Sequence, residues 1–143
     1  MNIFTAHKRE VNGRIEIETV AEHSRRTAGK AEQYAEKIGT SAIARLQGMI
    51  HDAGKLCRDF NEYILEKNDF RRGMIDHCYA GARFLMQLAE KSGEDKMIET
   101  ARFISHTVIS HHGLHDWVDK EGNDYFRERI SKNERYEEIK NNL

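Results

Sequence analysis

Apolar residues recur at three- and four-residue steps in four segments of this chain, and a glycine follows each segment. This spacing places the apolar side chains on one face of an α-helix. The chain has ten glycines and no proline, which favours helices that end at glycine caps. We therefore predict an all-α bundle of five to seven helices. The glycines that follow the four segments are Gly39, Gly54, Gly93 and Gly113.

The first of these helices has the clearest signals. Thr19 and Glu22 have the spacing of a capping box, and Gly39 lies just beyond the end. Its predicted inward face carries Val20, Ala28, Ala31, Tyr34, Ala35 and Ile38, with His23 on the same side. Further helices are predicted from near Ser41 to Gly54, over 56–65, from near Asp76 to Ser92 and from Glu94 onwards, with one or two more in the last thirty residues. In the helix after Asp76, Gly81 would permit the close approach of another backbone.

A short hairpin is predicted before the first helix. Asn12-Gly13 is a favoured two-residue turn, and residues 14–18 alternate between apolar and charged side chains. The two features together indicate two paired strands.

The composition indicates one domain over residues 1–143 in the cytosol, with no membrane partner. Charged residues make up 33% of the chain and apolar residues 38%, and no apolar run is long enough to span a bilayer. The N-terminus lacks the regions of a secretory signal. Cys57 and Cys78 form no CxxC pair, so we interpret both as reduced, buried thiols.

Eight histidines are unusual in a chain of 143 residues. The predicted helices carry five of them inward, and Asp52 directly follows one of the five. Each buried imidazole without a partner would cost about 1 to 3 kcal/mol, and a shared metal site would remove this cost. The five are His23, His51, His77, His111 and His112. The other three, which we interpret as surface or loop residues, are His7, His106 and His115.

These residues also resemble a family. The ordered set is His23-Ser24, His51-Asp52-Ala53-Gly54-Lys55, Asp76-His77 with Gly81-Ala82, and His111-His112-Gly113. It is similar to the HD phosphohydrolase superfamily and, within it, to the HD nuclease domain of the helicase-nuclease of type I CRISPR systems. Phe60 and Ala6-His7 also fit that pattern, and the resemblance covers residues 5–115.

The resemblance implies a site with one or two divalent metal ions. His23, His51 and Asp52 would hold the first ion, and Asp52 would bridge to the second. His77, His111 and His112 would complete the second site, and Lys55 would lie near the scissile phosphate or orient Asp52. Mixed imidazole and carboxylate ligands suit Mn²⁺, Fe²⁺, Co²⁺, Ni²⁺ or Zn²⁺ better than Mg²⁺.

One departure from the family pattern concerns a further aspartate that normally closes the first metal site, well downstream of the paired histidines. The carboxylates available here are Asp116, Asp119 and Asp124. Our first interpretation is that all three are loop residues. The alternative is that Asp116 or Asp119 acts as a substitute ligand. Either the chain is truncated at its C-terminal end, or the first metal is held less tightly.

Basic and aromatic residues near these motifs could contact a nucleic acid. Arg25, Arg26 and Lys30 lie beside His23 in the first helix, and Arg26 and Lys30 are our candidates for binding the phosphate backbone. The alternative is a solvated helix face. Trp117 could stack on a base, or it could anchor the loop after Gly113.

Three functions follow as hypotheses. The first is a metal-dependent HD nuclease that cuts single-stranded DNA in CRISPR interference, with a helicase segment or subunit and the RNA-guided interference complex as partners. The second is an HD phosphohydrolase that acts on a nucleotide. The third is a non-catalytic docking module that a metal ion stabilises.

Overall fold

The computed structural model of the protein describes residues 3–113 and 117–143 and begins with a β-hairpin. Strand β1 (Thr5–Val11) pairs antiparallel with β2 (Arg14–Thr19). The turn residues Asn12 and Gly13 both have positive φ, at 52° and 73°, as a tight hairpin turn of primed type requires. The predicted hairpin is therefore confirmed.

Helix α1 (Val20–Ala35) starts at the predicted capping box. The Thr19 hydroxyl accepts a hydrogen bond from the Glu22 amide, and the Glu22 carboxylate accepts one from the Thr19 amide. A short 3-10 turn, η1 (Glu36–Ile38), ends at Gly39 in the left-handed conformation. The capping prediction is thus confirmed at both ends of this segment.

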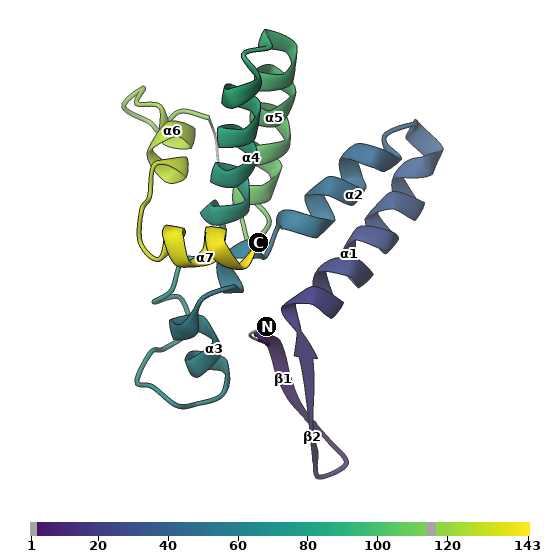
Figure 1. The fold of residues 1–143 in the computed structure, drawn as a ribbon, viewed down its shortest axis with the longest axis vertical. Helices are drawn as coiled ribbons and strands as arrows, with labels where there is room; N and C mark the ends of the chain where they lie inside the picture. The colour runs from purple at the N-terminus through teal and green to yellow at the C-terminus, as the bar shows by residue number, and fades with distance from the viewer. Residues whose placement is uncertain (1–2, 114–116) are drawn as a thin grey trace.

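Seven α-helices cover most of the described residues and confirm the predicted all-α class (Figure 1). Helix α1 lies against α2, and α4 lies against α5. Figure 1 shows these two pairs meeting near the end of α2 and diverging from there. The remaining elements are α2 (Ser41–Ile50), η2 (Ala53–Lys55), α3 (Arg58–Ile64), α4 (Tyr79–Ser92), α5 (Asp95–Ile109), α6 (Tyr125–Ile130) and α7 (Tyr136–Asn142). None of the described helices is both long enough and apolar enough to cross a bilayer.

Two predicted helix boundaries are wrong. Helix α4 begins at Tyr79 and not near Asp76, because the Asp76 carboxylate accepts a hydrogen bond from the Cys78 amide and holds a turn before the helix. The apolar pattern predicts that helix α5 continues through His111 and His112 to Gly113, but it ends at Ile109, so the paired histidines lie in the turn that follows it. In both cases the histidines are on connecting segments, where their side chains can turn towards the centre of the molecule.

Part of the predicted apolar face of the first helix is also wrong. Tyr34 and Ile38 are 75% and 76% exposed. Val20, Ala28 and Ala35 are buried as expected. The reason is that the far part of α1 packs mainly against α2, at a distance from α4 and α5 (Figure 1).

Two glycines bring three backbone segments into contact at the point where the helix pairs meet. A Cβ atom at Gly81 in α4 would lie 2.0 Å from the Ile50 carbonyl oxygen, and one at Gly54 in η2 would lie 2.2 Å from the His77 carbonyl oxygen. The expected close approach at Gly81 is therefore present. These contacts fix the end of α2, η2 and the start of α4 around one centre.

Candidate metal centre

Asp52 lies at that centre, between α2 and η2, and only 3% of its surface is exposed. One carboxylate oxygen, Oδ2, lies 3.1 Å from Nε2 of His23 and 3.3 Å from Nε2 of His51. The same oxygen lies 2.8 Å from Nζ of Lys55, which is also buried. Three predicted site residues from α1, the end of α2 and η2 therefore meet at one oxygen atom.

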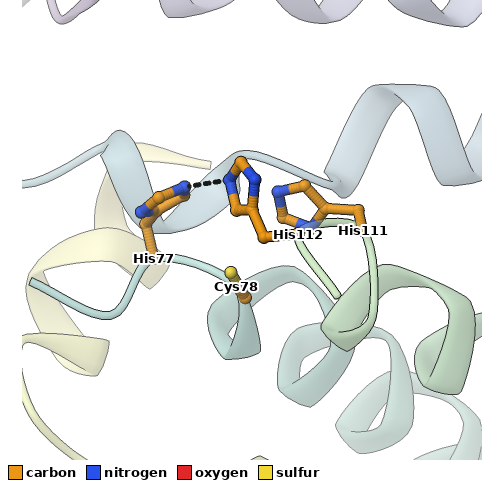
Figure 2. A group of neighbouring side chains, drawn as sticks. All are labelled: His77, Cys78, His111 and His112. Atoms are coloured by element: carbon orange, nitrogen blue, oxygen red, sulfur yellow. Dashed lines mark hydrogen bonds between the residues drawn. The ribbon is translucent and has the colours of Figure 1, made fainter. Parts of the chain in front are cut away.

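The other oxygen of Asp52 faces the remaining histidines. Oδ1 lies 3.3 Å from Nε2 of His111 and 3.7 Å from Nε2 of His77. His77 and His112 approach each other to 2.8 Å between their Nε2 atoms, as the dashed line in Figure 2 shows. Ligand atoms of these three histidines and of Cys78 lie within 4.8 Å of one another. The structure thus brings the other five predicted metal ligands together at Asp52, four of them within 3.7 Å of its carboxylate oxygens and His112 beside His77.

Four of these imidazoles have the same orientation. In each, Nδ1 lies near an oxygen atom that can only accept a hydrogen bond, which favours the tautomer with the proton on Nδ1 and the lone pair on Nε2. A ring held in this way is typical of a metal ligand. The acceptors are the Glu18 carboxylate for His23 (3.2 Å), and the carbonyl oxygens of Gly48 for His51 (2.9 Å), Ile75 for His77 (3.4 Å) and Val108 for His111 (2.7 Å). Nδ1 of His23 also lies 3.2 Å from Nη2 of Arg26, which can only donate.

The inward-facing atoms are short of partners within the protein. Asp52 Oδ1 and His111 Nε2 are buried without a hydrogen bond, and the Nε2 atoms of His23 and His51 face each other at 3.2 Å. Converging lone pairs repel one another unless a proton or a cation lies between them. The donor set therefore fits a divalent cation better than it fits a hydrogen-bonded core.

The pKa shifts of Asp52 and His77 favour their ligating forms, whereas contact with Asp52 raises the pKa of His51. Burial alone would raise the pKa of Asp52, but the neighbouring His111 and His51 side chains and the charge of Lys55 outweigh it and hold that pKa far below its usual range. Burial lowers the pKa of His77 to about 4. At neutral pH the carboxylate is therefore ionised and the His77 ring is neutral, as metal binding requires.

The interpretation of His7 as a surface residue is confirmed, but the structure also places it beside the candidate metal centre. His7 is exposed, but its ring lies 4.6 Å from that of His23, and ligand atoms of His7, His23 and Asp52 lie within 4.8 Å of one another. Partial burial and the charge of Lys55 lower the pKa of His7. A signal was present in the sequence, because a turn at Asn12-Gly13 pairs residue 7 with residue 18, beside the start of α1.

Glu18 was not identified from the sequence, although it contacts a predicted ligand. Its carboxylate accepts hydrogen bonds from Arg26, at 2.7 Å and 3.0 Å, as well as facing His23. The hydrogen bond from Arg26 lowers the pKa of Glu18 to about 2. Arg26 thus binds the glutamate that faces His23. Lys30 lies one turn further along α1 and is exposed to solvent. The predicted roles of both cations in substrate binding stay predictions.

A cavity of about 980 Å³ lies between the hairpin and the start of α1, beside this centre. His7 and Glu18 line it, together with the basic side chains of Arg9, Arg25 and Arg26. Lys8, Glu16 and Glu22 also line it, so the cavity joins the metal-binding groups to a wall of mixed charge that includes four basic side chains.

Two of the downstream aspartates, Asp119 and Asp124, lie in the described part of the chain, and both bind backbone amides near them in the sequence. Asp119 accepts hydrogen bonds from the amides of Glu121 and Asn123, and Asp124 caps α6. Their interpretation as loop residues is therefore confirmed, and Asp116 and His115 lie outside the described residues.

Trp117 anchors the chain that follows the paired histidines. It stacks on His106 at 4.2 Å between ring centroids and packs against the main core. Cys78 is buried, as predicted, although it lies within reach of the second histidine group.

Glu18→Gln is expected to weaken metal binding by about 10–100-fold, the usual effect of losing a partner that orients a ligand. The neutral amide would no longer fix the Nδ1–H tautomer of His23. Isothermal titration of metal-free protein with Zn²⁺ measures the change. Glu16→Gln is the matched control, since Glu16 lies on the same strand and pairs with Arg9. Equal affinities in the two variants would contradict the orienting role of Glu18.

A helical domain that gathers imidazoles from several segments around one buried aspartate has the architecture of a metal-dependent hydrolase. The HD domain family matches residues 20–142, and the chain belongs to this family. HD domains are generally metal-dependent phosphohydrolases, and the His and Asp cluster could hold a divalent ion. A search of the curated proteins finds none that matches the chain. The resemblance to the HD superfamily is confirmed, whereas the CRISPR subtype stays a prediction.

Proposed function

We propose that this HD domain is a divalent-metal-dependent nuclease that hydrolyses phosphodiester bonds of single-stranded DNA in CRISPR interference, beside a helicase and an RNA-guided complex. One observation carries the proposal: Asp52 faces imidazoles with both carboxylate oxygens, and hydrogen bonds at Nδ1 leave those rings free to ligate. This role implies action in the cytosol, where such complexes meet DNA.

The proposed ligands divide at Asp52. His23 and His51 would hold the first ion together with Asp52, and the second group would hold the other ion together with the same carboxylate. Two divalent ions would supply an activated water and stabilise charge on the phosphate. The second group comprises His77, His111 and His112. Imidazole-rich ligands favour Mn²⁺, Fe²⁺, Co²⁺, Ni²⁺ or Zn²⁺ over Mg²⁺.

Lys55 is proposed to orient Asp52 and not to contact the phosphate. Its Nζ lies 2.8 Å from Oδ2 and its side chain is 5% exposed. A cation buried in this way neutralises the carboxylate and fixes the direction of its oxygens. It has little access to a substrate in the cavity.

One basic side chain of the cavity lining supports a polyanionic substrate. Arg9 and Arg26 are each paired with a glutamate, whereas the Nε of Arg25 donates to the carbonyl oxygen of Ala21 within its own helix. Arg25 is therefore the cation of this wall best placed to meet a phosphate group of a strand that passes the metal centre.

The test uses metal-free protein supplied with Mn²⁺, Ni²⁺ or Zn²⁺ and an end-labelled single-stranded DNA. Cleavage that EDTA stops, and that Asp52→Asn lacks, would support the nuclease. Release of phosphate from a panel of nucleotides with intact DNA would overturn it in favour of the nucleotide phosphohydrolase. An inert protein with one tightly held ion would overturn it in favour of the docking module.

A further inference from the structure

A β-bulge interrupts the hairpin immediately before His7. Thr5 pairs with Thr19 and His7 pairs with Glu18, so one extra residue, Ala6, stands in β1. Thr5 and Ala6 are both buried, with 4% and 0% exposure, whereas consecutive residues of a regular strand point to opposite faces. The bulge therefore changes the direction in which His7 projects.

The bulged segment is held against the elements that form the metal centre. The Thr5 amide donates to the side chain of Asn61 in α3 at 2.9 Å, and Lys55 approaches the Ala6 carbonyl oxygen at 3.5 Å. The Phe4 carbonyl oxygen accepts from the Val20 amide at 2.8 Å. His7 is thus carried by a backbone fixed on both sides, and not by a loose terminal strand.

The position of His7 completes a set of three donors on the open side of the centre. Its ligand atoms lie within 4.8 Å of those of His23 and Asp52, and it also lines the cavity of about 980 Å³. Transition metals in protein sites take four or more ligands. Of the described downstream carboxylates, Asp119 and Asp124 are engaged in their own loop.

We infer that His7 is a ligand of the first metal ion, together with His23, His51 and Asp52. The inference rests on the proposed metal-dependent function and extends it to the hairpin, which precedes the residues 20–142 that match the family. In this assignment the imidazole of His7 takes the place of the downstream aspartate that normally closes the first metal site in the family pattern. The ligand set of the first ion then contains more nitrogen atoms. The hairpin is then part of the active centre and not only a cover for it.

The test compares metal binding by wild type and His7→Ala through equilibrium dialysis against Co²⁺ and elemental analysis. Two ions per wild-type chain are expected, and the variant should bind one of them more than about tenfold more weakly. Losing a residue that only orients a metal ligand already weakens binding by about tenfold or more, and losing a ligand should cost at least as much. The visible absorption of Co²⁺ should change with the loss of a nitrogen ligand. His7→Glu, which keeps a ligating side chain, should restore the second ion.

The control is Glu10→Ala, an exposed residue on the same strand, which should bind both ions as the wild type does. Unchanged stoichiometry, affinity and spectrum in His7→Ala would overturn the inference and leave the proposed function standing. Unchanged metal binding with slower DNA cleavage would also overturn it, since His7 would then contact substrate. A wild-type protein that binds no ion would instead refute the proposed function.

Discussion

Asp52→Asn is expected to lower the free energy of unfolding of the metal-free protein by about 3–5 kcal/mol, the usual cost of removing one partner of a buried ion pair. Lys55, 4% exposed and 2.8 Å from Oδ2, would lose its counter-charge. The variant should also lose tight metal binding, because both groups of imidazoles face this carboxylate. Urea denaturation measures the first effect, and elemental analysis measures the second.

The double variant Asp52→Asn, Lys55→Met separates the two effects. Replacing both members of a buried ion pair by uncharged groups is often close to neutral for stability, so the double variant should recover most of the lost free energy. Metal binding should remain lost. Equal stabilities of the single and double variants would show that the uncompensated charge of Lys55 is not the cause.

Gly81→Ala is expected to destabilise the protein by about 3 kcal/mol, the upper end of the usual range for overpacking. The added Cβ would lie 2.0 Å from the Ile50 carbonyl oxygen, a backbone atom that cannot move aside without shifting the end of α2. That shift would displace His51 and Asp52, so metal affinity should fall as well. Thermal unfolding and metal titration measure the two effects.

Gly29→Ala is the matched control, since Gly29 is exposed in α1 and a Cβ there would meet nothing within 4 Å. It should stabilise the protein by about 0.5–1 kcal/mol, because alanine favours a helix interior more than glycine does. A Gly81→Ala protein as stable as the Gly29→Ala protein would refute the close approach of α4 to α2.

The six candidate metal ligands could be identified because each is tied to a local pattern. His23 lies on the apolar face of a capped helix, and His51 and Asp52 follow the last turn of another. Such patterns indicate which side of an element is buried. The structure gathers all six predicted ligands, although the ends of α4 and α5 place three of the histidines on turns.

His7 and Glu18 could not be assigned in the same way, because their roles depend on residues far along the chain. His7 reaches the centre through a bulge that contacts with α3 and η2 hold in place. Glu18 acts through the His23 ring that it orients. Tyr34 and Ile38 show the opposite error, because the sequence predicted them to be buried and the structure exposes them. A helical apolar pattern identifies one face of a helix but does not show whether another element covers that face.

The sequence by itself indicated the helices, the hairpin turn and six candidate ligands, because capping, apolar periodicity and turn geometry act over a few residues. Only the tertiary structure decided which donors converge, which carboxylate lies between them and which basic residues border the cavity. These depend on close backbone contacts such as those at Gly54 and Gly81, where the absence of a side chain lets three segments meet at Asp52.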